Sequence, residues 1–436
     1  MELEKLDFPE EWQVMPIREA YAFTKKPRGL SIPSDALVPF LPMEKIPIGR
    51  VRVFAFEERL GSALTSGTYI ENGDLLIAKI TPSFENGKQA IVDWKKPFGF
   101  ATTEVIPLQE IEGVSDKFFL FHLLLHPAIR SDLAGKMDGT TGRQRLSKEV
   151  LGSRLIPLPP LAEQRKIAGV LGVVQRALEQ QERLIALTTE LKKTLLHHLF
   201  TQGLRGEPQK QTEIGLVPES WEVVPIREAY KFTKKPRGLK IEDEDLVPFL
   251  PMDTIPIGRI YVSGFEERLG SALSSGTYIE NGDLLVAKIT PSFENGKQAI
   301  VDWKRPFGFA TTEVLPIQER EGISDKHFLF HILLHPAVRS DLAGKMDGTT
   351  GRQRLSKEVL GARLIPLPPI SEQREIASML NMFCEKQEVH ERKRAALTAL
   401  FRTLLHQLMT AQLRVHNLDL SELYQEGKAE MPCGST

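Results

Sequence analysis

The sequence predicts an α+β protein with two tandem globular domains of mixed α/β structure, each followed by a long α-helix. Three observations support this fold class: an internal repeat of domain size, a proline-free segment with apolar residues at heptad steps after each globular part, and short apolar stretches bounded by turn residues inside the globular parts. The chain has 436 residues, 41% of them hydrophobic, which is enough to bury two or more cores.

The repeat is the clearest feature of the chain. Residues 9–204 align with residues 218–413 at a constant shift of 209, without a gap. Residues 79–94 recur letter for letter at 288–303, and residues 133–152 recur at 342–361. Each repeat therefore has a globular part whose chemistry is duplicated, and whatever surface one globular part presents, the other presents again.

Inside the globular parts, the spacing of apolar stretches and turn residues predicts strands, hairpins and short helices. Apolar stretches at 74–80 and 89–92 lie between Asn-Gly turns and predict strands. Residues 118–125 and 128–133 predict two short helices broken at Pro127. Together these features predict a twisted sheet with small helices.

The segment after each globular part is predicted to be one long helix. Residues 161–200 contain no proline, and their apolar residues follow the alternating three- and four-residue steps of a coiled-coil seam: Ile167, Val170, Val174, Ala177, Leu184, Leu191 and Leu195. The second copy keeps this register but is interrupted by Lys386, His390 and Lys393, which leaves room for other helices at the seam. A helix of about 39 residues is roughly 58 Å long. The prolines before each helix, at 157–160 and 366–369, predict a stiff hinge.

These patterns predict five segments. They are a first globular domain at 1–160, a central helix at 161–208, a second globular domain at 209–369, a C-terminal helix at 370–415 and a tail at 416–436.

Composition narrows the class of protein. The net charge is −1, and the first globular domain has 20 Lys plus Arg against 21 Asp plus Glu, so any nucleic-acid site must rest on local clusters. The two cysteines suggest no disulfide framework. No basic-then-apolar leader and no apolar run of about 20 residues occurs, so we expect a cytoplasmic protein without membrane spans.

Three clusters in each repeat are candidates for DNA contact. The first is a basic proline turn that can reach backbone phosphates, although a solvated surface loop explains the same residues: Lys25, Lys26 and Arg28, with Lys234, Lys235 and Arg237 in the second repeat. The second is a loop between two strands that can read base edges or hold phosphate, although an ordinary hairpin has the same letters: Lys79, Thr81, Asn86 and Lys88, with Lys288, Thr290, Asn295 and Lys297.

The third cluster is a glycine-flanked segment with a local positive charge. Between Lys136 and Arg154 there are five cations and two anions. The glycines let the backbone approach a partner closely, and Arg and Gln can pair bidentately with guanine and adenine, although a capped turn is the alternative interpretation. The candidate residues are Thr140, Thr141, Arg143, Gln144 and Arg145, with Thr349, Thr350, Arg352, Gln353 and Arg354.

We find no sequence pattern for catalysis or metal binding. There is no glycine-rich phosphate loop ending in Lys-Ser or Lys-Thr, and no Asn-Pro-Pro-Tyr-like tetrapeptide of the amino-methyltransferase kind. The histidines His197, His198 and His406 lie in the predicted long helices without other ligands at metal spacing. The sequence therefore predicts no catalytic residue and no metal site.

The junction between globular part and helix carries a family resemblance. The segment Ile-Pro-Leu-Pro-Pro-Leu-Ala-Glu-Gln-Arg-Lys-Ile-Ala at 156–168, with its counterpart at 365–377, resembles the specificity subunit of type I restriction-modification systems. The Asn-Gly-Asp-Leu-Leu strand and loop of that family match residues 72–88 and 281–297. The resemblance implies that each globular domain is a target recognition domain that reads half of a split DNA sequence, and that the two helices pair as an antiparallel coiled coil.

The resemblance also implies partners and cofactors. The partners are double-stranded DNA, two modification subunits and, where they exist, restriction subunits, with no membrane involved. The chain itself is expected to be non-catalytic and to carry no cofactor, because S-adenosylmethionine belongs to the modification subunit that methylates adenine, and ATP and Mg²⁺ to the restriction subunit. The near-identity of the two domains departs from the usual family pattern. It predicts a palindromic target with the same bases in both halves.

Two other classes of protein remain as alternatives. One is an enzyme of unknown type with a duplicated catalytic domain, and the other is a coiled-coil scaffold. The first lacks a recognisable catalytic constellation, and the second leaves the unchanged repeat of residues 79–94 without a reason.

Overall fold

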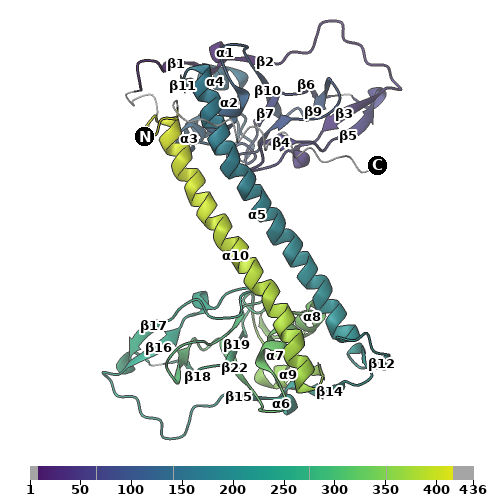
Figure 1. Cartoon of the computed structure of the whole chain (residues 1–436), viewed down its shortest axis with the longest axis vertical. Helices are drawn as coiled ribbons and strands as arrows, with labels where there is room; N and C mark the ends of the chain where they lie inside the picture. The colour runs from purple at the N-terminus through teal and green to yellow at the C-terminus, as the bar shows by residue number, and fades with distance from the viewer. Residues whose placement is uncertain (1–7, 65, 141, 274, 350, 416–436) are drawn as a thin grey trace. The chain divides into compact units, whose positions relative to one another are not determined.

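The structure, a computed structural model, describes residues 8–64, 66–140, 142–273, 275–349 and 351–415 (Figure 1). It forms two compact units, Met1–Glu182 with Lys393–Thr436, and Arg183–Arg392. Each unit thus contains one globular domain, the adjoining part of the helix that follows this domain, and part of the long helix from the other repeat.

The globular domain of the first unit is built on two sheets. One has five strands in the order β2-β10-β7-β8-β4, antiparallel except for β8 and β4, and the other has four strands in the order β5-β3-β9-β6. The strands are β1 (Gln13–Pro16), β2 (Tyr21–Phe23), β3 (Leu37–Leu41), β4 (Arg52–Val53), β5 (Glu57–Leu60), β6 (Thr68–Glu71), β7 (Leu75–Ala78), β8 (Gln89–Val92), β9 (Phe98–Ala101), β10 (Val105–Glu110) and β11 (Leu155–Leu158). The strands predicted at 74–80 and 89–92 are β7 and β8.

Four short α-helices complete the described part of this domain, with two 3-10 turns at Met43–Lys45 and Gly61–Ala63, and the break between α2 and α3 agrees with the predicted break at Pro127. The α-helices are α1 (Ile17–Ala20), α2 (Lys117–Leu123), α3 (Pro127–Gly135) and α4 (Lys148–Ser153). Strand β7 is buried on both faces, because Leu75 and Ile77 belong to the core shared with α2 and α3, whereas Leu76 belongs to a second core with residues from the four-stranded sheet.

The second globular domain repeats this arrangement, with sheets in the orders β15-β22-β19-β20 and β17-β16-β21-β18. Its strands are β14 (Glu222–Pro225), β15 (Tyr230–Phe232), β16 (Leu246–Leu250), β17 (Glu266–Leu269), β18 (Thr277–Glu280), β19 (Leu284–Ala287), β20 (Gln298–Ile300), β21 (Phe307–Ala310), β22 (Val314–Glu319), β23 (Asp347–Thr349), β24 (Arg352–Arg354) and β25 (Leu364–Leu367). Its helices are α6 (Ile226–Ala229), α7 (Lys326–Leu334), α8 (Pro336–Ala343) and α9 (Lys357–Ala362), and a hairpin of β12 (Gln209–Thr212) and β13 (Gly215–Pro218) precedes it.

The proline-rich junctions do not form the stiff hinge that the sequence predicts. Strand β11, which contains Pro157, pairs antiparallel with β1 and so belongs to the globular domain. The buried Gln164 in the first turn of the long helix then ties helix and domain together: its amide nitrogen donates to the carbonyls of Pro159 (2.8 Å) and Val114 (3.0 Å), and its oxygen accepts from the Asp116 N–H (2.9 Å). Gln373 makes the equivalent contacts in the second domain.

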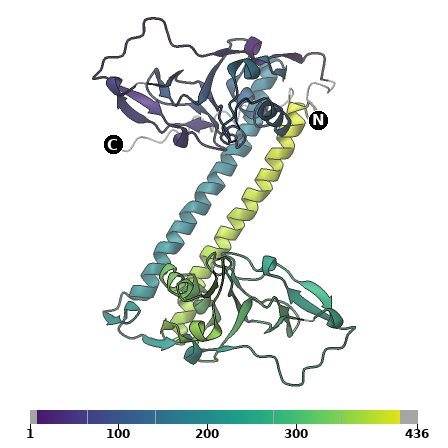
Figure 2. The ribbon, with the colours of Figure 1, turned by 180° about the vertical axis from the view of Figure 1, so that it is seen from behind.

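The two long helices are α5 (Leu161–Gln202, 42 residues) and α10 (Ile370–Met409, 40 residues). They are antiparallel. In the first unit, Ile167 near the start of α5 shares a core with Leu408 near the end of α10, and in the second unit Leu199 of α5 shares a core with Ile376 of α10. Figure 2 shows from behind that the two helices lie side by side in each unit.

The predicted coiled-coil seam is correct towards the helix ends and wrong in the middle of α5. Ile167 and Val174 are buried, whereas the side chains of Leu184 and Leu191 are 39% and 56% exposed. The ends are buried because each globular domain packs over them, and the middle lacks that cover. None of the helices in the described part of the chain is both long and apolar enough to cross a membrane.

Candidate nucleic-acid interface

The structure brings the second and third clusters together into one surface in each domain. Ile80 pairs with Arg145 in an antiparallel β-bridge. The Thr81 N–H donates to the Gln144 carbonyl (3.0 Å), and the Leu146 N–H donates to the Lys79 carbonyl (2.7 Å). The same bridge joins Ile289 to Arg354 in the second domain. Residues 63 positions apart in the sequence therefore form one joined loop pair, residues 79–88 and 139–148, with its copy at 288–297 and 348–357.

The two arginines of the third cluster have different surroundings. The Arg145 guanidinium makes a bidentate ion pair with Glu104, in which Nε and Nη2 each lie 3.0 Å from a carboxylate oxygen. These hydrogen bonds and the arginine charge lower the pKa of the Glu104 carboxyl. Arg354 and Glu313 repeat the pair. Both arginines are exposed, and Arg143 is the last residue of the turn that begins at Thr140.

The turn at the tip depends on glycine. Gly139 has φ 137°, and a Cβ there would lie 2.6 Å from the Arg143 carbonyl oxygen, so a larger residue would strain the turn. The Arg143 N–H closes this turn by donating to the Thr140 carbonyl (2.8 Å). Thr140 is exposed, as is Thr349 in the copy, whereas the predicted contacts Thr141 and Thr350 lie outside the described residues.

A half-buried arginine supports the loop at 79–88. Arg130 of α3 donates to the carbonyls of Phe84 (3.1 Å) and Leu124 (2.7 Å) and to the side chain of Gln89 (3.2 Å). Phe84 is buried, and Asn86 is exposed at the loop surface. Arg339 has the same role under the second loop. Sequence reasoning missed these arginines, because no local pattern relates a helix residue to a loop more than 40 positions away.

The lysines of this loop are partly buried. Lys79 and Lys88, with Lys288 and Lys297 in the copy, are neither fully exposed nor buried. The Lys297 ammonium donates to the Met252 carbonyl (2.7 Å), so at that position the side chain also supports the loop.

The first cluster leaves the five-stranded sheet directly after β2. Lys25, Lys26 and Arg28 are exposed, as are Lys234, Lys235 and Arg237. The Lys26 ammonium lies 5.7 Å from the centre of the Phe100 ring in β9, and Lys235 lies 5.6 Å from that of Phe309. These contacts place the basic turn against the four-stranded sheet.

The Asn-Gly-Asp turn before β7 has a structural role. Asp74 is buried, and its carboxylate accepts hydrogen bonds from the Thr24 hydroxyl (2.9 Å) and the Glu71 N–H (2.8 Å). Burial raises the pKa of Asp74 to about 6, and that of Asp283 likewise. Because Thr24 directly precedes the basic turn, this hydrogen bond positions the start of the first cluster.

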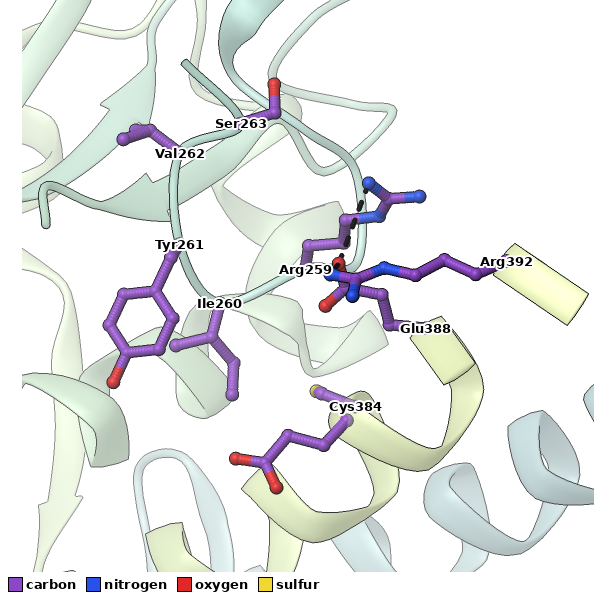
Figure 3. Close-up of a pocket in the computed structure, with 9 residues that line it drawn as sticks. Arg259, Ile260, Tyr261, Val262, Ser263, Cys384, Glu388 and Arg392 are labelled. Atoms are coloured by element: carbon purple, nitrogen blue, oxygen red, sulfur yellow. Dashed lines mark hydrogen bonds and ion pairs between the residues drawn. The ribbon is translucent and has the colours of Figure 1, made fainter. Parts of the chain in front are cut away.

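A cavity of about 300 Å³ lies in the second unit between the segment 259–263 and helix α10 (Figure 3). Arg259 and Arg392 both contact Glu388, and Arg259 also lies 3.5 Å from Glu391. Buried Cys384 accepts a hydrogen bond from the Lys192 ammonium (3.0 Å). The Arg259 ion pairs attach the domain to α10, and the Lys192–Cys384 hydrogen bond joins the two long helices. Within the described ranges, no group of three or more His, Cys, Asp or Glu side chains could hold a metal ion.

Each unit thus has an α/β domain with a joined basic loop pair, docked on a long helix. The family model for the type I restriction modification DNA specificity domain matches residues 9–189 and again residues 218–399. The chain therefore belongs to the type I restriction-modification DNA specificity family, which confirms the resemblance seen in the sequence.

Individual relatives agree with this assignment. The type I restriction enzyme MjaVIII specificity subunit of Methanocaldococcus jannaschii is 25% identical over 431 residues, which covers 96% of each chain. The putative MjaX specificity subunit of the same organism is 22% identical over 421 residues, covering 94% of this chain and 95% of that one. The crystal structure of the type I S subunit from M. genitalium has a similar fold, with a TM-score of 0.57 at 16% identity, covering 93% of this chain and 96% of that chain.

Proposed function

We propose that this chain reads a bipartite, palindromic DNA target, one half with each globular domain, and positions two modification subunits for adenine methylation. The observation that carries the proposal is the joined loop pair. Its two segments are identical in the two repeats, and in each domain a β-bridge joins them into one surface with exposed residues able to contact bases.

Within this surface we assign different roles to the predicted residues. Arg143, Thr140 and Asn86 are exposed and are the candidates for base contacts. Arg145 is paired with Glu104, so it mainly positions the loop. Lys25, Lys26 and Arg28 are candidates for phosphate contacts, because a flexible cation on a surface turn neutralises backbone charge without reading sequence.

The predicted palindrome follows from the repeat and the antiparallel helices. We infer that the two equivalent domains engage the duplex about an approximate two-fold axis, and a two-fold across duplex DNA exchanges its strands. Each domain then reads its half on the opposite strand. Because the reading loops are identical, the target is one short sequence, a non-specific gap and the inverted complement of that sequence.

The exposed apolar residues in the middle of the long helices support docking of other subunits. Leu184, Leu187 and Leu191 of α5 are exposed, as are Met382 and Val389 of α10. Apolar side chains on a helix face are a common docking surface for a partner helix. We assign this surface to the modification subunits, which bring S-adenosylmethionine, while any restriction subunit brings ATP and Mg²⁺.

Methylome sequencing of cells that carry this chain with its modification subunit tests the proposal. We expect methylated adenines in a split palindrome with identical half-sites. Two unrelated half-sites would show that the reading residues lie outside the joined loops, and no new methylation dependent on this chain would contradict the proposed function.

A further inference from the structure

The second globular domain contains an open pocket of about 560 Å³ around β15. This strand is at the edge of the four-stranded sheet β15-β22-β19-β20. We call this pocket the β15 pocket. Its charged lining residues are Arg227, Lys231, Lys234, Arg320, Lys357 and Glu280. Two of them belong to the predicted DNA clusters, since Lys234 opens the basic turn and Lys357 ends the glycine-flanked segment.

The charge balance of this pocket favours an anion. Five cations line it, and its carboxylate, Glu280, already accepts hydrogen bonds from the Tyr278 hydroxyl (3.2 Å) and the Gln318 amide (2.6 Å). Several cations that converge on a concave surface raise the local positive potential and attract phosphate.

Two of these cations are positioned by the surrounding structure. The Arg320 guanidinium donates to the Arg227 carbonyl (3.2 Å), and the Lys357 ammonium lies 4.8 Å from the centre of the Phe232 ring. Arg227, Lys231, Lys234 and Arg320 are exposed, so an incoming phosphate can reach them. An arginine guanidinium suits phosphate particularly well, because its planar donors match two phosphate oxygens.

The two domains differ at this pocket in a specific way. The lining residues of the β15 pocket match their counterparts in the first domain at all but two positions, where Ala22 stands for Lys231 and Ile111 for Arg320. The second domain therefore has two more cations at these positions than the first, while the other lining residues and the joined loop pair are identical.

We propose that the β15 pocket binds a phosphate of the DNA backbone, so that the second domain holds DNA more strongly than the first although both read the same bases. The proposal rests on the proposed function of the chain. It predicts that the two halves of the target are equal in sequence and unequal in their contribution to affinity.

The two natural differences provide a matched pair of variants in the full-length chain. Lys231→Ala with Arg320→Ile gives the second domain the residues of the first, and Ala22→Lys with Ile111→Arg does the reverse. Binding of a random-sequence duplex is measured by fluorescence anisotropy over a range of KCl concentrations. One lost phosphate contact makes the slope of log affinity against log salt concentration shallower by about 0.9. We expect this shallower slope for the Lys231→Ala, Arg320→Ile variant. We expect a steeper slope for the Ala22→Lys, Ile111→Arg variant.

A second measurement separates DNA from a free anion. Inorganic phosphate is titrated calorimetrically into the parent chain and the Lys231→Ala, Arg320→Ile variant, at constant ionic strength. A shallower slope with DNA supports the proposal. Loss of phosphate binding with an unchanged slope assigns the pocket to a free anion and overturns the DNA contact, and no change in either measurement overturns the pocket itself.

Failure of the proposed function gives a different result. A parent chain that binds no duplex at low salt, alone or with its modification subunit, contradicts the DNA-recognition function, and it overturns the DNA contact of the pocket with it. In the opposite case, a parent chain that binds DNA while both variants keep its slope leaves the function intact and contradicts only the pocket.

Discussion

Arg143 and Arg145 are two positions apart, yet the fold places their side chains in different contacts. Arg145 is exposed and pairs with Glu104, whereas Arg143, which is also exposed, lies in a turn that requires glycine at position 139. The sequence could locate this group of basic residues from its composition. It could not separate Arg145, which pairs with Glu104, from Arg143, the proposed base contact, because Glu104 is 41 residues away in the chain.

We expect Arg143→Ala to weaken binding to one half-site and Arg352→Ala to weaken binding to the other. Each loss should be about 1–3 kcal/mol if the arginine pairs with a guanine. Affinities of the modification complex for duplexes altered in one half-site measure this effect. Lys96→Ala, at an exposed lysine outside the loops, is the control, and equal losses from it would argue against a reading role for Arg143.

The histidine contact between the N-cap of α3 and helix α10 in the first unit predicts a dependence of stability on pH. His126 Nε2 lies 3.2 Å from His406 Nδ1, and burial, with a smaller effect of His406, lowers the pKa of His126 to about 4. Between about pH 6.5 and pH 4 the unfolded chain binds this proton and the folded chain does not, so the contribution of His126 to stability falls as pH decreases.

This pH effect can be isolated by substitution. His126→Asn keeps a side chain that can cap α3. The midpoint temperature of thermal unfolding should decrease less between pH 7 and pH 5 in this variant than in the parent chain. The exposed His198→Asn substitution should not change this decrease. Asp74 acts in the opposite direction, because its raised pKa of about 6 makes its contribution fall as pH rises from about 4 to 6. The comparison must therefore be made between variants and not from the pH profile of the parent alone. An unchanged pH dependence in His126→Asn would contradict this account.

At the scale of elements, the first turn of each long helix fastens a domain to its helix. Gln164→Ala leaves the buried Asp116 N–H and the carbonyls of Val114 and Pro159 without their partner. We expect a loss of about 2–4 kcal/mol in unfolding free energy, because each unsatisfied buried group costs about 1–3 kcal/mol and some relax. Urea denaturation measures this loss. Gln373→Ala should match it, and a loss as large from exposed Gln180→Ala would count against the explanation.

The long helices can act as a ruler for the gap in the target. Insertion of one heptad before Thr188 and one before Leu397 adds about 10.5 Å to each helix. At about 3.4 Å per base pair, the preferred gap should lengthen by roughly three base pairs if the DNA follows the helices. Methylome sequencing with the lengthened chain reads the gap directly. Recognition of the original gap by a folded variant would refute the ruler.

At the scale of the whole molecule, each compact unit depends on helix residues from the other repeat. In the first unit these include Leu405, Leu408 and Met409, and the equivalent residues of α5, Leu196, Leu199 and Phe200, serve the second unit. A fragment of residues 1–208 therefore carries both a domain and the apolar helix end that such a domain requires.

We expect the 1–208 fragment to form a two-fold symmetric dimer in which each α5 covers the domain of its partner. Analytical ultracentrifugation measures the oligomeric state. Replacing Leu196 and Leu199 with serine should weaken the dimer. If the unsubstituted fragment stays a stable monomer at high micromolar concentration, this result contradicts the predicted dimer.

The sequence by itself determined the duplication, the two long helices, the short helices around Pro127 and the family. These features are encoded locally, by periodicity, proline position and near-identical segments, or globally, by the repeat itself. Only the tertiary structure decided four features. These are the joined loop pair, the Arg145–Glu104 pairing, the support from Arg130 and the firm attachment of each long helix to its domain in place of the predicted hinge. They arise because β1 pairs with β11 and residue 80 with residue 145, and pairing between distant strands depends on the packing of the whole domain, which no local pattern specifies.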